Sequence, residues 1–274
     1  ALHKQVESGK KQFAGIELPN RTLGIIGLGA IGGLVADAAL KLGMKVLGYD
    51  PEITVEAAWR LSSQVRKAHS VEEVLKNSDF VTLHVPLLEM TRNLVNAEHI
   101  ALMRPGAVLL NFSREGIVDD HAVVAALEGR KLKSYVCDFP SNALKGHPGV
   151  VALPHLGAST QEAEDNCAIM VVDQVRDFLE NGNILNAVNF PSVEMVRESA
   201  YRIAIANANV PNMVGQISTA MAQFGLNIHN MVNKSKGEMA YTLVDVDSPV
   251  PPVAIDRIAA IPGVLAVRAL PAGN

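Results

Sequence analysis

The sequence is poor in the residues that mark several large protein classes. It has 2 cysteines and 1 tryptophan among 274 residues, and aromatic residues make up only 4%. Two cysteines are too few for a disulfide framework or a cysteine-rich metal site, so we expect a reducing, cytoplasmic setting and no bound metal. The apolar runs stop well short of the roughly 18 residues that a membrane helix needs. The polar first residues, 1–7, predict no secretory leader.

An excess of positive charge is also absent. The chain has 24 Lys and Arg against 28 Asp and Glu, which gives a formal net charge of −4. Such a chain has no overall attraction to nucleic acid or to an anionic membrane, and no Lys/Arg run marks a local basic patch. Hydrophobic residues make up 49%. The composition is therefore that of a globular protein, and the length fits one large domain or two smaller ones.

Short apolar runs alternate with helical patterns along the first part of the chain. Strands are predicted at 23–27, 45–50, 80–85, 107–111, 135–138 and 150–153. Helices are predicted at 30–42, from Ser70 onward, and from Asp119 or Asp120 to Gly129. Alternation of this kind indicates βαβ units, and so an α/β fold with a Rossmann-type, doubly wound parallel sheet.

The rest of the chain has a different pattern. Residues 159–181 predict one long helix, and residues 186–194 a strand remnant followed by a linker. The later segments are predicted strands at 201–208, 226–233, 239–247 and 263–270, with helices at 211–224 and 252–260. Their order is βαββαβ, which is typical of a ferredoxin-like domain. The sequence therefore predicts two domains with a joint around residues 190–200.

A glycine fingerprint lies between the first predicted strand and the first predicted helix. Gly27, Gly29 and Gly32 frame Leu28, Ala30 and Ile31 in the pattern G-x-G-x-x-G. Glycines in this context allow a tight turn, close approach of a pyrophosphate and close packing of helix on strand. Asp50 ends the next strand, where a carboxylate accepts hydrogen bonds from the ribose hydroxyls of NAD and repels the extra phosphate of NADP. The sequence therefore favours NAD over NADP, and a dinucleotide site over a purely structural glycine turn with a helix-capping aspartate.

These features resemble the D-2-hydroxyacid dehydrogenase family over essentially the whole chain. The most specific stretches are 27–50, 108–119 and 154–166, together with the C-terminal βαββαβ unit, which resembles an ACT domain. The resemblance implies four parts: a crossover segment, an NAD-binding domain, a returning helix with a substrate-domain remnant and linker, and an ACT regulatory domain, at 1–22, 23–158, 159–196 and 197–274. It also implies that this chain lacks the N-terminal substrate lobe of the family.

The resemblance implies three catalytic positions. Arg114 lies in an Asn-x-x-Arg turn and is expected to grip the substrate carboxylate with its planar guanidinium. Glu115 follows it where the family usually has glycine. His155 lies in a Pro-His-x-Gly-x-x-Thr segment and is expected to exchange a proton with the substrate oxygen, with His147 as its rival. Asn142 stands where the family has a glutamate that orients the histidine.

Further positions are expected by resemblance to contact a cofactor or an effector. The cofactor positions outside the fingerprint are Val85, Pro86, Thr91, Asn111, Asp138 and Gly157. Asn209 and Asn227 fall where the ACT domain of the family binds serine, and Asn207, which is expected to join them, falls where some members use histidine. The other reading of these asparagines is turn and cap chemistry, which asparagine favours. Because ACT units usually pair side by side, we expect a homo-oligomer, a dimer or a tetramer.

The resemblance implies NAD-dependent oxidation of a D-2-hydroxy acid. The ACT-like unit favours the branch of the family that oxidises 3-phospho-D-glycerate to 3-phosphohydroxypyruvate, the entry to serine synthesis. Three alternatives remain: another D-2-hydroxy acid as substrate, an NAD-sensing regulator, and a fragment that binds serine without catalysis. We expect a small-molecule substrate, no nucleic acid partner and no membrane, and poor turnover in a chain without the substrate lobe.

Overall fold

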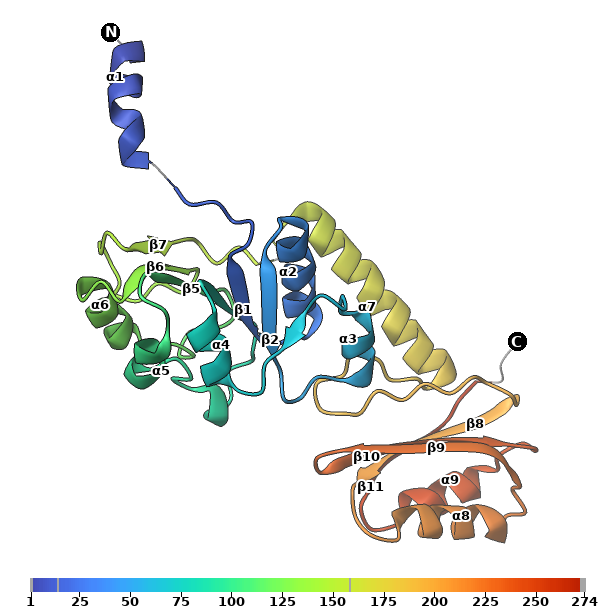
Figure 1. Cartoon of the computed structure of the whole chain (residues 1–274). Coiled ribbons are helices and arrows are strands. Elements are labelled where there is room, and N and C mark those ends of the chain that lie inside the picture. The colour runs from blue at the N-terminus through green and yellow to red at the C-terminus, as the bar shows by residue number, and fades with distance from the viewer. Residues whose placement is uncertain (1, 14, 158, 272–274) are drawn as a thin grey trace. The chain divides into compact units, whose positions relative to one another are not determined.

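The chain divides into two compact units, and the division follows Gly157 (Figure 1). The structure, a computed structural model, describes residues 2–13, 15–157 and 159–271. Each unit has buried apolar clusters of its own, and no cluster draws residues from both. Among the described residues, no helix combines the length and the hydropathy that crossing a membrane requires.

The first unit is built on a sheet of seven parallel strands in the order β3-β2-β1-β4-β5-β6-β7. The strands are β1 (Thr22–Ile26), β2 (Lys45–Tyr49), β3 (Arg66–Lys67), β4 (Phe80–Leu83), β5 (Ala107–Asn111), β6 (Leu132–Cys137) and β7 (Val150–Ala152). The helices are α1 (Leu2–Gly9), α2 (Ala30–Lys41), α3 (Val55–Arg60), α4 (Val71–Asn77), α5 (Ala97–Leu102) and α6 (Asp120–Glu128), with 3₁₀ turns η1 (Lys10–Phe13) and η2 (Glu89–Thr91).

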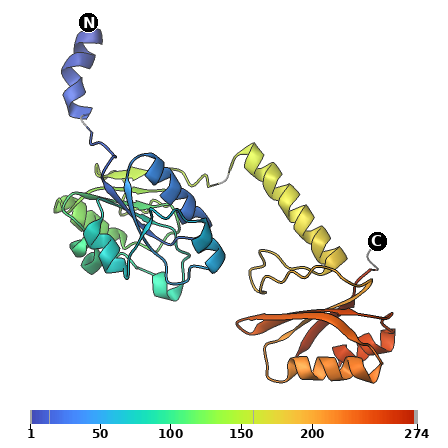
Figure 2. The same cartoon turned by 45° about the vertical axis from the view of Figure 1, so that its right-hand side comes forward.

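Strand β1 makes plain that the sheet is covered on both faces. Its side chains alternate, so Leu23 and Ile25 join Ala36 of α2 in one buried cluster, while Ile26 joins Val74 of α4 in another. Figure 2 shows the helices of this unit on both sides of its strands. The predicted doubly wound parallel sheet is therefore confirmed.

Side-chain caps fix where two of the helices begin. The Ser70 hydroxyl accepts a hydrogen bond from the Glu73 N–H at 3.2 Å, and the Glu73 carboxylate accepts the His69 N–H at 2.7 Å. Asp119, rather than Asp120, caps α6, because its carboxylate accepts the N–H groups of His121 and Ala122. Both helices thus begin where the sequence predicts, with their first free N–H groups satisfied.

Helix α3 follows β2 and was missed by the sequence patterns. Thr54 caps it by accepting the Ala57 N–H, and Glu56 pairs with Arg60 one turn later. None of its residues is buried, and Trp59 is 84% exposed. Because an exposed helix carries no apolar periodicity, the pattern that predicts buried helices cannot find it.

The second unit combines a long helix with a four-stranded antiparallel sheet. Its elements are α7 (Gln161–Asn181), β8 (Tyr201–Ala208), α8 (Met213–Gln223), β9 (Ile228–Lys236), β10 (Met239–Val246), α9 (Pro252–Ala259) and β11 (Val264–Ala269), with strand order β11-β8-β10-β9. Helices α8 and α9 lie on the same face of the sheet (Figures 1 and 2). The predicted βαββαβ order is confirmed.

The segment between α7 and β8 corrects two expectations. Ile184 and Val193 bond to each other in an isolated bridge and, with Met195, pack in a cluster on the face of the sheet opposite α8 and α9. Residues 186–190 are not a strand, since Asn186 has a φ of +55° and Pro191 follows. Nor does the chain divide at residues 190–200, because this segment packs within the second unit. The four functional ranges stay predictions.

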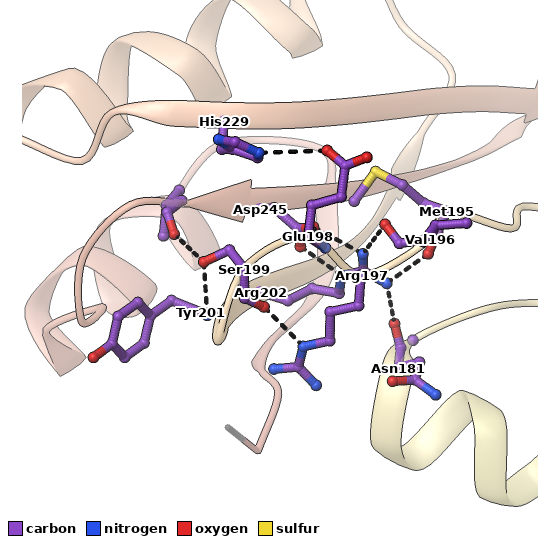
Figure 3. Close-up of polar contacts among 12 residues, drawn as sticks. Asn181, Met195, Val196, Arg197, Glu198, Ser199, Tyr201, Arg202, His229 and Asp245 are labelled. Carbon is purple, nitrogen blue, oxygen red and sulfur yellow. Dashed lines mark hydrogen bonds and ion pairs between the residues drawn. The ribbon is translucent and has the colours of Figure 1, made fainter. Parts of the chain in front are cut away.

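A buried ion pair ties this segment to the sheet (Figure 3). Both side chains are inaccessible to solvent, and Arg202 bonds to both oxygens of Asp245, at 2.6 and 2.9 Å. Its remaining three N–H groups bond to the carbonyls of Asn181, Met195 and Val196. All five donors of the guanidinium are therefore satisfied, as burial of such a charge requires.

Candidate active site

The glycine loop between β1 and α2 has the geometry of a phosphate-binding turn. Gly27 has a φ of +93°, and a Cβ there or at Gly32 would clash with the backbone of His84 or of Gly27 itself. Around Gly29, by contrast, nothing lies within 4 Å of where a Cβ would stand. Gly29 is the N-cap of α2, and no side chain caps it. The free N–H groups of the helix therefore face open space, as anion binding requires.

Asp50 follows β2 and lies directly beside this loop. One of its carboxylate oxygens accepts the Leu28 N–H at 2.8 Å, and the other accepts the Glu52 N–H at 2.9 Å. Each oxygen keeps a further lone pair for a ribose hydroxyl. The two bonds fix the carboxylate in place before a ligand arrives, so the residues present fit a dinucleotide.

The segment after β4 forms the other wall of the loop. The His84 carbonyl contacts Gly27, and burial lowers the pKa of the His84 imidazole, whose Nε2 lies 3.0 Å from the Thr82 hydroxyl. Val85 packs against the main core, whereas Pro86 is exposed. The Thr91 hydroxyl donates to the Pro86 carbonyl at 2.6 Å and accepts the Leu88 N–H at 2.7 Å. Thr91 therefore shapes this loop through its own backbone bonds.

Arg114 is presented by a turn that Asn111 organises. Asn111 ends β5 and is buried; its amide donates to the Arg114 carbonyl at 3.0 Å, and its oxygen accepts the Ser113 N–H at 3.1 Å. The Ser113 hydroxyl donates to Leu83 at the end of β4. Arg114 is exposed, and no carboxylate among the described residues pairs with it. One Nη1–H of its guanidinium donates to the Ser113 carbonyl at 2.7 Å, and its other N–H donors are left for an external carboxylate.

Glu115 does not distort this turn. The left-handed position is taken by the next residue, Gly116, with a φ of +80°, while Glu115 keeps a negative φ. The departure from the glycine of the family is thus compatible with the backbone, because a side chain is strained only in the left-handed region.

His155 lies beyond the end of β7 and is exposed. Its ring contacts the Phe139 ring, with centroids 4.3 Å apart and planes inclined at 47°. Gly157 follows with a φ of +50°, close to the imidazole Nε2. The rival His147 is committed elsewhere, since its Nδ1 accepts the Gly149 N–H at 3.0 Å.

Two polar residues on the loop after β6 behave differently. Asp138 is only 9% exposed, and its Oδ1 is buried without a hydrogen-bond partner. Such an acceptor needs a donor that the described residues do not supply. Asn142 is exposed, and the described structure gives it no hydrogen bond to His155. The orienting role suggested for Asn142 stays a prediction.

The predicted residues follow strands that end at one edge of the sheet. β1, β2, β4, β5, β6 and β7 are parallel, so their carboxyl ends share one edge, and the strand order reverses between β1 and β4. Ligands of open α/β sheets bind at this edge, beside such a reversal.

Among the described residues, no group of three or more His, Cys, Asp or Glu side chains could hold a metal ion. The arrangement suits binding of a dinucleotide and of a carboxylate, with an exposed imidazole for proton transfer.

Sequence reasoning missed the residues that support the site. Ser113 and Tyr135 contact Asn111, and Phe139 contacts His155. Burial raises the pKa of the Tyr135 phenol, whose oxygen lies 3.5 Å from the Asn111 amide. Burial, with the nearby charges of Asp119 and Glu115, also raises the pKa of Asp120. The sequence held one indication for Phe139. It lies two residues after β6, and His155 lies three residues after the neighbouring strand β7.

The asparagines of the second unit divide between a cavity and the surface. Asn207 and Asn209 line a cavity of about 150 Å³ beside the start of α8. Asn207 is 1% exposed, and its Oδ1 is buried without a partner. The Asn209 amide donates to the Gly237 carbonyl at 3.0 Å. Asn227 is exposed and bonds to Asp247, outside the residues that line this cavity.

Curated relatives resemble the chain over most of its length. D-3-phosphoglycerate dehydrogenase of Methanocaldococcus jannaschii is 38% identical over 196 residues, which are 69% of this chain and 37% of the relative. The protein of the same name from Escherichia coli K12 is 33% identical over 267 residues, 93% of this chain and 64% of the relative. This chain therefore spans between about a third and two thirds of these relatives.

Solved structures and a family profile agree with that likeness. D-2-hydroxyisocaproate dehydrogenase matches with a TM-score of 0.57 at 28% identity, over 66% of this chain and 61% of the other. D-lactate dehydrogenase from Aquifex aeolicus, solved with NAD and lactic acid, matches with a TM-score of 0.53 at 28% identity, over 64% and 60%. The profile of the D-isomer specific 2-hydroxyacid dehydrogenase NAD-binding domain matches residues 1–157, the whole first unit. The chain belongs to the D-isomer specific 2-hydroxyacid dehydrogenase family and carries its NAD-binding domain.

Proposed function

We propose that this chain serves an NAD-dependent dehydrogenase that oxidises 3-phospho-D-glycerate to 3-phosphohydroxypyruvate, the first step of serine synthesis. The observation that carries the proposal is the exposed Arg114 guanidinium, which pairs with no carboxylate among the described residues and follows a strand of the same sheet edge as the glycine loop and His155. The name of the relatives in Methanocaldococcus jannaschii and Escherichia coli supports this substrate.

Each catalytic residue has one task in this reaction. Arg114 grips the substrate carboxylate with two parallel charge-assisted hydrogen bonds, while Asn111 holds the turn that presents it. His155 takes the proton of the C2 hydroxyl as the carbonyl forms, and returns it in the reverse direction. Bound NAD supplies the acceptor for the hydride that leaves C2.

The cofactor residues follow from the loop geometry. Gly27, Gly29 and Gly32, with the intervening Ala30 and Ile31, hold the pyrophosphate on the N–H groups of α2. Asp50 binds the adenosine ribose, and Asp138 accepts a donor of the nicotinamide carboxamide at its unpartnered oxygen. Val85, Pro86, Thr91, Asn111 and Gly157 complete the site.

Turnover by the 274-residue chain is the deciding measurement. NADH oxidation with phosphohydroxypyruvate should be measurable and should fall by at least about a hundredfold in His155→Ala, the usual contribution of a general acid. Arg114→Lys should raise KM for the keto acid, because an ammonium cannot grip a carboxylate with two parallel bonds. Equal rates with pyruvate or glyoxylate would instead favour another 2-hydroxy acid. Tight NAD binding without turnover, also after the substrate lobe of the E. coli relative is supplied, would favour a regulator.

A second proposal concerns the second unit. We propose that it is an ACT-type regulatory domain in which Asn207 and Asn209 bind the amino acid serine, with Asn227 from the neighbouring copy. The buried, unpartnered oxygen of Asn207 supports this, since an ammonium group would satisfy it. Calorimetric titration with L-serine should give binding that Asn207→Leu abolishes. If neither the wild-type chain nor the variant gives a binding heat with L-serine, only turn and cap roles remain for these residues.

We further propose that the chain assembles with itself as a dimer or a tetramer. β9 lies at one end of the four-stranded sheet and offers its outer edge for pairing. Light scattering after gel filtration should give at least twice the chain mass of 29.2 kDa. A monomer at micromolar concentration would exclude this assembly.

A further inference from the structure

The aromatic contact of His155 carries an inference about how the imidazole is held. We propose that Phe139 is a positioning residue that fixes the His155 ring at the reaction site, an inference that rests on the role proposed for His155. The two rings lie 4.3 Å apart between centroids, at an inclination of 47°. At this separation the two rings are in direct contact, slightly closer than the roughly 4.5–7 Å at which aromatic pairs usually lie.

The sheet brings the two rings together. β6 and β7 pair in parallel with Cys137 opposite Ala152, and the Leu153 N–H donates to the Cys137 carbonyl at 2.9 Å. Both strands therefore leave the sheet side by side, so that Phe139 and His155 lie next to each other a few residues later. The register of one strand pair is sufficient to set this contact.

The backbone around Phe139 is anchored on both sides. Asp138 is 9% exposed and Leu144 is 1% exposed, while the Leu144 N–H donates to the Ser141 carbonyl at 3.2 Å. Phe139 itself is half-buried. A ring on a segment held in this way is a fixed surface, against which a more mobile side chain can rest.

His155 needs such a surface because its other restraints are few. It is exposed, and among the described residues neither a hydrogen bond nor an ion pair reaches its ring. A histidine without a partner samples several χ1 rotamers, and only some of them point the ring at a substrate. The neighbouring Phe139 face also attracts the imidazolium that forms when the ring takes a proton. Phe139 thus orients the His155 ring by packing, as a carboxylate would orient it by a hydrogen bond.

Proton NMR on the whole chain tests the contact without any need for turnover. The ring protons of His155 are identified by their loss in His155→Gln. Phe139→Leu keeps the apolar bulk and removes the ring current, so these resonances should move toward those of a free histidine. Phe139→Tyr should keep them in place, and Phe224→Leu, in the second unit, serves as the matched control. Unchanged His155 resonances in Phe139→Leu would overturn the proposal.

Kinetics test the positioning itself. Phe139→Leu should lower kcat for keto-acid reduction about tenfold, since small misplacements of a catalytic group are costly. KM for NADH should stay unchanged, and Phe139→Tyr should restore kcat to within about threefold of wild type. A wild-type kcat in a Phe139→Leu variant that has lost the NMR contact would overturn the positioning role. Lack of turnover in the wild-type chain, also after the substrate lobe of the E. coli relative is supplied, would speak against the proposed reaction, and the NMR result would still decide the contact.

Discussion

At the scale of single residues, the site depends on side chains that are fixed by backbone bonds. Asp50 is the clearest example, because one carboxylate oxygen accepts the Leu28 N–H of the glycine loop and the other accepts the Glu52 N–H. We expect Asp50→Ala to weaken NAD binding by about tenfold or more, since bonds to a charged group are lost. Calorimetric titration measures this, with Glu52→Gln as a control that removes a charge two residues away. Equal affinity in Asp50→Ala would mean that the ribose binds elsewhere.

Asn142 gives a second prediction at this scale. It is exposed, and Asn142→Glu would place a carboxylate at the position where the resemblance puts the glutamate that orients the histidine. A negative charge stabilises imidazolium, and the acid limb of the pH–rate profile should therefore move to higher pH. Asn142→Ala should leave the profile in place. An unchanged profile in Asn142→Glu would remove position 142 from the mechanism.

At the scale of elements, the ion pair of Arg202 and Asp245 connects α7, β8, β10 and the segment before β8 (Figure 3). Arg202→Met leaves a buried carboxylate without its partner and should lower the free energy of unfolding of the second unit by about 3–5 kcal/mol. Urea unfolding measures the change. Arg176→Met, which breaks an exposed pair with Asp173, should change it by less than about 1 kcal/mol. Similar losses of unfolding free energy in Arg202→Met and Arg176→Met would mean that the buried pair contributes no more to stability than the exposed one.

The same pair predicts acid sensitivity. Burial acts to raise the pKa of Asp245, but the bonds from Arg202 and the Glu198 N–H outweigh it and hold the pKa below its ordinary value. A carboxyl with a depressed pKa stabilises the fold above its unfolded value of about 3.9, and that contribution is lost as pH falls through the folded pKa. Unfolding of the second unit followed by circular dichroism should therefore become easier below about pH 4. Asp245→Asn should lack this dependence and be less stable at neutral pH.

Predictability from sequence also differs between elements. β1, β2, β4 and β5 lie close to their predicted places, because a strand buried on both faces is a continuous apolar run. β3 has only Arg66 and Lys67, both exposed, and its pairing depends on the neighbouring strand. The motifs around Arg114 and His155 could be found in the sequence. The sequence shows that Phe139 and His155 each follow a strand at a similar distance, but their contact depends on the register of the two strands, which only the folded sheet sets.

At the scale of the whole molecule, the two units have separate cores, and the glycine loop and Asp50 lie in the first. A ligand that binds only a folded unit stabilises that unit, by about 2.7 kcal/mol at a hundred times its Kd. NAD should therefore raise the Tm of one calorimetric transition and leave the other in place, and L-serine should do the converse. A single transition that both ligands shift equally would mean that the units unfold together.

The exposed Trp59 on α3 has an optical consequence. It is the single tryptophan of the sequence, and α3 begins five residues after Asp50, on the strand-end side where the adenosine of NAD is expected. Its emission overlaps the absorption band of reduced nicotinamide, so excitation near 295 nm should sensitise the blue fluorescence of bound NADH. The chain thus carries its own spectroscopic reporter of cofactor occupancy, without a dye or a label.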